Sequence, residues 1–288
     1  MEQYLNLVKD ILKTGERKEN RTGIDTYLVS GRIFKHDMKK GFPILTTKRV
    51  PFQLVKSELE FFIKGLTDKR WLQERKNKIW DEWCNPKKVP YAHDEESKNR
   101  MMQENDLGPI YGFQWRHFGA EYKGPDADYS GQGIDQLATL VETLKNNPND
   151  RRMIVNSWNP AQLSQMALPP CHYGFQVTTS EGKVNLLWNQ RSVDTMLGLP
   201  FNIASYGLLL HLLAKESGLE EGILTGFLAD VHIYENHFEG AKEQLSRKPG
   251  ELPRIDTESF SSIFNWEFTD SKLVGYNPQL KIDFKIAV

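Results

Sequence analysis

The spacing of apolar residues changes along the chain, and each spacing predicts a kind of element. Apolar residues at every third or fourth position predict amphipathic helices, whereas runs rich in β-branched and aromatic residues predict strands. The predicted helices cover residues 3–14, 51–65, 134–147, 202–217 and 236–246. The predicted strands cover residues 26–37, 153–155, 172–179, 184–192 and 281–288, with one more strand through residues 230–234.

Two segments depart from simple amphipathic patterns. The helix at 202–217 is apolar on almost every side, which predicts a place in the core. Gly31 interrupts the strand at 26–37 and predicts a bend or a hairpin there. The expected fold therefore has one fully buried helix.

The helix predicted at 51–65 carries an acidic residue, Glu58, beside its apolar stripe. This carboxylate is either a charge at the edge of the stripe or a partly buried acid with a raised pKa. Lys56 and Ser57 are expected to face solvent.

Residues 84–106 are polar, charged and poor in aliphatic side chains, so we expect a surface insertion there. No stretch has the composition of a linker between domains, and no internal repeat is visible. We therefore expect one domain over residues 1–288.

Composition narrows the class of protein. Apolar residues make up 39% of the 288 positions, enough for a sizeable core. The formal charge of −1, with 37 basic and 38 acidic residues, gives no overall attraction for nucleic acid or an anionic membrane, so any phosphate site must be local. The sequence contains no signal peptide and no apolar run of about 18 residues, so a soluble cytoplasmic protein without membrane partners is expected.

Only two cysteines occur, Cys84 and Cys171, and neither has disulfide-framework or zinc-ligand spacing. Reduced thiols and no metal are therefore expected. A lone cysteine is most often a small apolar filler, and it reacts only in accessible, electropositive surroundings. Cys171 is a candidate nucleophile because several arginines and polar residues occur near it or could be brought to it.

Groups suited to a phosphorylated ligand are spread along the chain. Guanidinium groups can donate paired hydrogen bonds to phosphate, although each arginine alone could equally be a solvated surface group. The candidates are Arg21, Arg151, Arg152, Arg191, Ser192, His232 and Tyr234. His232 and Tyr234 share one strand face with Asp230, because side chains alternate along a strand.

The remaining polar candidates suit chemistry on a nucleotide base. The Asn202 carboxamide can donate and accept together, which matches a uracil edge, although a short polar residue near a helix start is also an ordinary cap. A Cys171 thiolate could add to an electron-poor ring carbon while Glu58 transfers protons. Residue chemistry alone thus indicates a nucleotide-modifying thiol enzyme.

Motifs over nearly the whole chain resemble those of the folate-dependent thymidylate synthase family. They are Arg21-Thr22-Gly23, Leu45-Thr46-Thr47-Lys48, Trp80-Asp81-Glu82-Trp83, Gly108-Pro109-Ile110-Tyr111-Gly112, Asn149-Asp150-Arg151-Arg152, residues 166–172, residues 190–194, residues 197–206, His232-Ile233-Tyr234 and Ala287-Val288. The resemblance implies an α+β fold, in which a single domain has a large bent mixed β-sheet packed by a buried central helix and surrounding helices.

The resemblance also implies the reaction. Cys171 would attack C6 of dUMP, and 5,10-methylenetetrahydrofolate would supply a one-carbon unit and a hydride to give dTMP and dihydrofolate. The enzyme would be a homodimer that needs no nucleic acid, with Arg151 and Arg152 donated to the partner's phosphate site.

Family roles carry over to matching positions of this chain. The catalytic set would be Cys171, Glu58, Tyr111, His172, Gln190, Arg191, Asp194 and Asn202. The dUMP-binding set would be Arg21, Arg151, Arg152, Arg191, Ser192, Asp194, Asn202, His232 and Tyr234. The folate-binding set would be Lys48, Ile79, Trp80, Asp194, Leu197, Gly198, Phe201 and Ala287, with Val288 completing a C-terminal lid.

Three positions depart from the family pattern: Pro51 stands where some family members have histidine, and Asn189 and Ala229 stand where tyrosine and glycine are usual. These changes concern the pocket wall more than the chemistry at Cys171. These changes leave open the alternative that the protein is a dUMP hydroxymethylase, in which water would add to the methylene intermediate. A catalytically inactive nucleotide-binding or RNA-binding protein is a further alternative.

Overall fold

A six-stranded mixed sheet organises the chain. The computed structural model describes residues 1–20 and 22–285, so Arg21, Ala287 and Val288 of the predicted site lie outside the described residues. The strands of the sheet are β1 (Glu16–Lys18), β2 (Thr26–Asp37), β3 (Ile154–Asn156), β4 (His172–Ser180), β5 (Lys183–Asp194) and β6 (Glu220–Tyr234), in the spatial order β1-β2-β6-β5-β4-β3. A separate hairpin pairs β7 (Arg254–Thr257) with β8 (Ser271–Val274).

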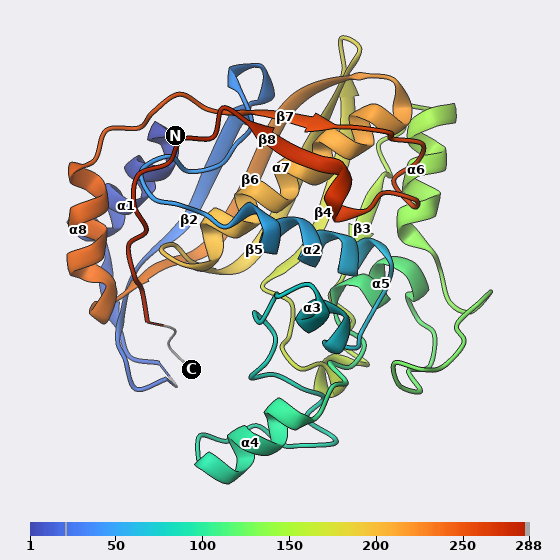
Figure 1. Cartoon of the computed structure of the whole chain (residues 1–288), viewed down its shortest axis with the longest axis horizontal. Helices are drawn as coiled ribbons and strands as arrows, with labels where there is room; N and C mark the ends of the chain where they lie inside the picture. The colour runs from blue at the N-terminus through green and yellow to red at the C-terminus, as the bar shows by residue number, and fades with distance from the viewer. Residues whose placement is uncertain (21, 286–288) are drawn as a thin grey trace.

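Helices pack against this sheet (Figure 1). They are α1 (Glu2–Thr14), α2 (Phe52–Ile63), α3 (Arg70–Glu74), α4 (Glu95–Gln103), α5 (Tyr111–His117), α6 (Gln136–Asn146), α7 (Gly198–Ser217) and α8 (Phe238–Ser246). The expected α+β domain with a mixed sheet is confirmed. No helix in the described ranges is long and apolar enough to cross a membrane.

The connection from β5 through α7 to β6 makes the sheet mixed. β5 and β6 run parallel, and the other neighbouring strands run antiparallel. Parallel strands need such a crossover, and their carboxyl ends meet at one edge of the sheet. Asp194 at the end of β5 therefore pairs in register with His232 near the end of β6.

Helix α7 lies at the core, as its all-round apolar sequence predicts. Leu208, Leu209 and Leu213 have no exposed surface. The helix begins at Gly198, four residues earlier than expected, because the Asp194 carboxylate accepts the N–H groups of two residues in the preceding turn at 3.1 Å. The capping interpretation of Asn202 is therefore wrong.

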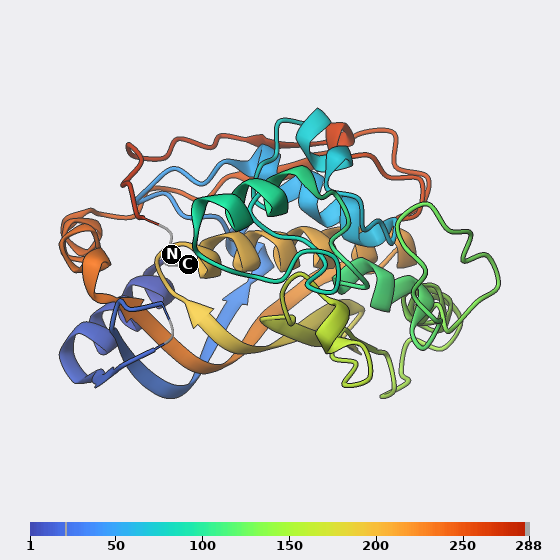
Figure 2. The ribbon, with the colours of Figure 1, turned by 90° about the horizontal axis from the view of Figure 1, so that it is seen from below.

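Helices α2 and α7 cover the same face of the curved sheet (Figure 2). The opposite face carries large apolar side chains in solvent. Ile33 is 62% exposed, and its cross-strand neighbour Phe227 is 41% exposed. Ile154 continues this surface on β3 and is 53% exposed. An isolated chain thus leaves one apolar sheet face without a covering layer.

The prediction that Lys56 and Ser57 face solvent is wrong. Both side chains are buried, and the Lys56 ammonium donates to the carbonyl of Ser271 at 2.7 Å. The hairpin of β7 and β8 and the turn at 268–270 bring that partner from more than 200 residues along the chain. The helical pattern of α2 carries no information about this distant layer.

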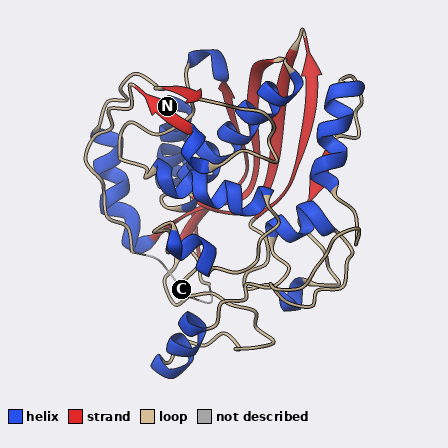
Figure 3. Cartoon of the chain, turned by 45° about the vertical axis from the view of Figure 1, so that its right-hand side comes forward, coloured by secondary structure: helices blue, strands red, loops and turns tan. Residues whose placement is uncertain are grey.

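Other boundaries also differ from expectation. Gly31 bends β2 at φ +63° but does not turn it into a hairpin. Residues 281–285 form no strand; instead the Lys285 carbonyl is hydrogen-bonded to His237 at 2.7 Å. The polar segment 84–106 contains α4, an unpredicted helix that projects from the rest of the molecule (Figure 3).

Candidate active site

Cys171 lies where the chain enters β4, and its backbone is held from two sides. Its N–H donates to the phenol oxygen of Tyr111 at 2.8 Å, and its carbonyl accepts the N–H of Arg191 at 2.9 Å. The residue is partly exposed. These contacts place the thiol between the start of α5 and the end of β5.

Aromatic rings line the interior beside this cysteine. We call Phe62, Trp80, Tyr111 and His172 the aromatic wall. Tyr111 stacks on Phe62 at 4.8 Å and on His172 at 4.5 Å between ring centroids, while Trp80 meets it edge-on at 6.1 Å. The wall joins α2, the turn after α3, α5 and β4 at one point.

His172 in this wall is held neutral. Burial lowers the pKa of its imidazole to about 3, because a charged ring would lose its hydration. Its Nδ1 atom is hydrogen-bonded to the Tyr206 hydroxyl at 2.9 Å. Tyr206 was not predicted as a site residue, although helical periodicity places it one turn after Asn202 on α7.

Of the two interpretations of Glu58, a charge at the edge of the apolar stripe or a partly buried acid, the structure bears out the second. Burial raises the pKa of its carboxyl to about 7, and the hydrogen bond that it accepts from the Trp80 indole at 2.8 Å partly opposes this rise. A carboxyl with a pKa near neutrality can both take up and release a proton. The aromatic wall thus holds a group suited to proton transfer.

The carboxamides of Gln190 and Asn202 are bonded to each other. Gln190 donates to the Asn202 side-chain oxygen at 3.0 Å, and its own oxygen accepts the indole N–H of Trp188 at 3.1 Å. Gln190 also pairs with His172 across β4 and β5. The orientation of Asn202 is therefore set by buried neighbours.

The carboxyl ends of β5 and β6 bring four further predicted residues together, Ser192, Asp194, His232 and Tyr234. Ser192 and Asp194 pair in register with Asp230 and His232. The Asp230 carboxylate is bonded to His232 Nδ1 at 2.8 Å, and this bond, followed by that of Lys18, lowers the pKa of Asp230 to about 2. Tyr234 follows at the end of β6, where its ring lies 5.3 Å from that of His232.

Arg191 packs against the loop that carries the cysteine. Its guanidinium donates to the carbonyls of Pro170 and Pro169 at 2.9 and 2.8 Å and lies 5.4 Å from the Trp158 ring centroid. A cavity of about 340 Å³ opens beside it, lined by Asn156, Trp158, Tyr173 and Arg191. Positive charge therefore lies next to the cysteine loop.

Arg151 and Arg152 do not join this group within one chain. They precede β3, which runs towards the Cys171 end of β4, because Ile154 pairs with Gln176 and Asn156 with Gly174; the two arginines therefore lie at the far end of β3. Strand geometry places Arg152 roughly 20 Å from Cys171. Its side chain is 88% exposed and is paired with Asp150 at 2.7 Å.

The predicted folate-facing residues differ in their exposure to solvent. Ile79 is 39% exposed, and Leu197, Gly198 and Phe201 are partly exposed at the start of α7. Lys48 is buried: its ammonium donates to the Met196 carbonyl and lies 4.6 Å from the Phe284 ring centroid. Burial lowers the pKa of Lys48 to about 8.

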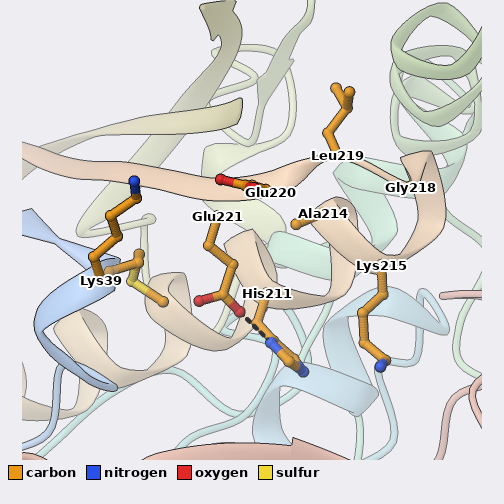
Figure 4. Close-up of a pocket in the computed structure, with 9 residues that line it drawn as sticks. Lys39, His211, Ala214, Lys215, Gly218, Leu219, Glu220 and Glu221 are labelled. Carbon is orange, nitrogen blue, oxygen red and sulfur yellow. Dashed lines mark hydrogen bonds and ion pairs between the residues drawn. The ribbon is translucent and has the colours of Figure 1, made fainter. Parts of the chain in front are cut away.

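A second cavity, of about 460 Å³, lies at the other end of α7 (Figure 4). Its wall includes His211, which is bonded to Glu221 at the start of β6. Asp230 follows nine residues later along the same strand, so roughly 30 Å separates this cavity from the cysteine end. No group of three or more His, Cys, Asp and Glu that could hold a metal occurs in the described part of the chain.

The family model for thymidylate synthase matches residues 2–288. The chain belongs to the thymidylate synthase family. It is 46% identical to the thymidylate synthase of Ascaris suum over 99% of this chain and 96% of that protein.

Two bifunctional dihydrofolate reductase-thymidylate synthases are similar to almost all of this chain. The relative from Paramecium tetraurelia is 45% identical over 99% of the chain, and the one from Zea mays is 44% identical over 99%. The chain spans 61% and 54% of the lengths of these two relatives. The shared family region thus includes both the aromatic wall and the cysteine loop.

Proposed function

We propose that the protein is a thymidylate synthase that methylates dUMP to dTMP. The observation that carries this proposal is the arrangement of Cys171, whose backbone is held by Tyr111 and Arg191 beside a carboxyl with a pKa of about 7. A positioned thiol, a proton-transfer group and an oriented carboxamide are the groups that addition to a uracil ring needs.

Each residue near the cysteine has a step in this proposal. The Cys171 sulfur forms a bond to C6 of dUMP, which makes C5 nucleophilic, and Asn202 reads the uracil edge. Glu58 and Tyr111 move protons, with neutral His172 and Gln190 holding the network. Arg191, Ser192, Asp194, His232 and Tyr234 hold the nucleotide, together with Arg21.

The residues around the start of α7 fit a flat, partly apolar co-substrate. Ile79, Leu197, Gly198 and Phe201 offer partly exposed surface beside the Trp80 ring. When bound, 5,10-methylenetetrahydrofolate supplies the one-carbon unit and the hydride that reduces it to a methyl group. Trp80, Asp194, Lys48 and Ala287 complete the proposed folate-binding set, and no metal is required.

A homodimer is the second part of this proposal. The apolar sheet face of Ile33, Phe227 and Ile154 offers a self-complementary surface, because two copies related by a twofold axis would bury the same patch on each. Arg151 and Arg152 lie beside this face at β3, too far from their own Cys171 to hold its ligand. We propose that each chain donates them to the phosphate site of the other.

A cytoplasmic location completes the proposal. Neither Cys84 nor Cys171 forms a disulfide in the structure, as is usual for proteins of a reducing compartment. The catalytic role of Cys171 also requires a reduced thiol.

A product assay tests the proposed reaction. The protein is incubated with dUMP and 5,10-methylenetetrahydrofolate, and nucleotide and folate products are identified by mass spectrometry and absorbance. We expect dTMP and dihydrofolate in equal amounts. Hydroxymethyl-dUMP with tetrahydrofolate would instead identify a hydroxymethylase, and binding of dUMP without any product would identify an inactive nucleotide-binding protein.

A further inference from the structure

Lys69, the residue before α3, has no exposed surface although it carries an ammonium group. That group donates to three backbone carbonyls, those of Asp81 at 2.7 Å, Trp83 at 3.1 Å and Met101 at 2.6 Å. An ammonium has three N–H donors, so all of them are satisfied. Lysines are almost never fully buried unless they are paired, so this arrangement requires an explanation.

The three carbonyls come from two separate segments. Asp81 and Trp83 belong to the turn at 78–83, whereas Met101 belongs to α4 in the polar segment 84–106. We call these three carbonyls the Lys69 cage. Removing the ammonium would leave their oxygens facing one another in a buried space, where carbonyl dipoles repel and lose their donors. Lys69 therefore holds the two segments together.

The turn held by this cage carries groups of the candidate site. Trp80 directly precedes Asp81, the first of the two caged residues of the turn, and its indole donates to Glu58 at 2.8 Å. Gln73 adds a further contact to the same turn, from its side-chain nitrogen to the Asp81 carboxylate at 3.0 Å. Neither Lys69 nor Gln73 contacts Glu58 itself in the described hydrogen bonds.

Backbone hydrogen bonds also join the end of the 84–106 segment to the residues around Lys69. The Lys69 N–H donates to the Asn105 carbonyl at 3.0 Å, and the Leu107 N–H donates to the Thr67 carbonyl at 2.9 Å. The chain then leads to Tyr111 through Gly108, whose N–H is bonded to the Asp106 carboxylate at 2.7 Å. Two of the four chain segments that supply rings to the aromatic wall, those of Trp80 and Tyr111, therefore meet around Lys69.

We propose that Lys69 is a positioning residue that holds the turn at 78–83 against the 84–106 segment and so keeps Trp80 over Glu58. This rests on the proposed function, because it assumes that Trp80 and Glu58 act on folate and on protons. It also assigns a role to the 84–106 segment, which serves as the second support of the Trp80 turn.

Chemical rescue of Lys69→Ala tests this role. The truncation leaves the three carbonyls of the cage in a space that a small alkylammonium ion can enter. We expect kcat to fall and the KM for folate to rise, each about tenfold, because small misplacements of a reacting group are costly. The Kd for dUMP, measured by calorimetry, should stay within about twofold of wild type, since its ligands lie on other elements.

Ethylammonium or propylammonium should restore both parameters in a saturable manner, whereas tetramethylammonium, which has no N–H, should not. The matched control is Lys87→Ala, which removes an exposed lysine of the 84–106 segment and should keep wild-type kinetics with and without amines. Wild-type kinetics in Lys69→Ala would overturn the proposal. A fall in kcat alone, with an unchanged folate KM and no rescue, would reduce Lys69 to a purely structural residue and would also overturn it.

A second variant tests the positioning role of Lys69 if Lys69→Ala does not fold. Gln73→Met removes a partly exposed contact to the same turn, and we expect a smaller rise in the folate KM, about threefold. An unchanged KM would then contradict the proposal.

Hydrogen exchange separates this proposal from the proposed function. In Lys69→Ala, or in Gln73→Met if the first variant does not fold, residues 78–83 should exchange faster than in wild type, whichever product the enzyme makes. Unchanged exchange there would count against the Lys69 cage, while absence of dTMP from wild type would count only against the proposed reaction.

Discussion

The aromatic wall and the arginine pair at 151–152 differ in how complete they are within one chain. Three of the four members of the wall are held by hydrogen bonds within the same chain: Tyr111 to the Cys171 backbone, His172 to Tyr206, and Trp80 to Glu58. Arg152 is 88% exposed and pairs with Asp150 two residues away. The aromatic wall is thus assembled by the folding of one chain, whereas the arginine pair at 151–152 remains exposed on it, which is the reason that we propose a phosphate site shared with a second chain.

This difference teaches where binding and catalysis are to be expected. Burial shifts the pKa values of His172 in the aromatic wall and of Glu58 beside it, because a dry interior penalises the charged form strongly. Arginine side chains stay charged in solvent, so exposed arginines are available to bind an anionic ligand or a partner chain. Substitutions in the wall should therefore act on turnover, and substitutions at the arginines should act on binding.

The largest expected effect comes from the thiol at the edge of the wall. Cys171→Ala should lower kcat by at least about 10⁴-fold, because no other group can form the bond to the ring carbon. The variant should still bind dUMP, as measured by calorimetry. Turnover within a factor of ten of wild type would remove Cys171 as the nucleophile.

Glu58→Gln should come next, with kcat lower by about 10²- to 10³-fold. Glutamine keeps an oxygen to accept the Trp80 N–H but cannot exchange a proton. The limb of the wild-type pH profile near pH 7 should therefore disappear from the residual activity, as measured by kcat over pH 5 to 9. A limb that persists near pH 7 would assign that ionisation to another group.

Phe227→Asp tests whether Arg151 and Arg152 take part in activity only when a second chain is present. A carboxylate in the centre of the apolar sheet face should prevent association, because it would be buried unpaired in the dimer. Sedimentation should show monomers, and activity should fall about tenfold or more. Leu280→Asp, at a position that is 83% exposed, should stay dimeric. Fully active Phe227→Asp monomers would contradict the proposal that the arginine pair acts in the site of a second chain.

Arg152→Ala should have a smaller effect, a rise of about tenfold in the KM for dUMP with little change in kcat. Mixing it with Cys171→Ala sharpens the test. A mixed dimer would contain one site with an intact cysteine from one chain and an intact arginine from the other. After the two variants are refolded together, one of the two sites in each mixed dimer should therefore have the wild-type KM for dUMP. If no site regains that KM, Arg152 acts in the site of its own chain.

The smallest effect concerns stability at the wall. In the unfolded chain Glu58 ionises near pH 4.5, but in the folded protein it ionises near 7, so the unfolded state loses its proton first as pH rises. Glu58 therefore costs the folded state stability that grows between these values and stays constant above them. Glu58→Gln should be equal to wild type at pH 4.5 and more stable by about 2 kcal/mol at pH 8, after allowance for partial exposure. Urea unfolding at the two pH values measures this, and equal stability at both would contradict the raised pKa.

Much of the fold was predictable because it depends on local periodicity. The all-round apolar run predicted the buried α7, and a glycine between two strands predicted the β4–β5 hairpin, in which Glu181 and Gly182 have φ values of +51° and +75°. The even spacing of Asp230, His232 and Tyr234 likewise predicted their common strand β6. The pattern at 281–285 resembled a strand but found no partner strand to pair with.

The sequence by itself determined which chemistry is available: one thiol near arginines, a carboxylate on an apolar helix and a carboxamide at the start of another. Only the tertiary structure decided that Glu58 has a pKa near 7, that Lys56 is buried under β8, that Lys69 is caged by three carbonyls and that Arg152 lies far from Cys171. The physical reason is that burial, desolvation and unpaired surfaces depend on which distant segments pack together, and the periodicity of one segment does not record its neighbours.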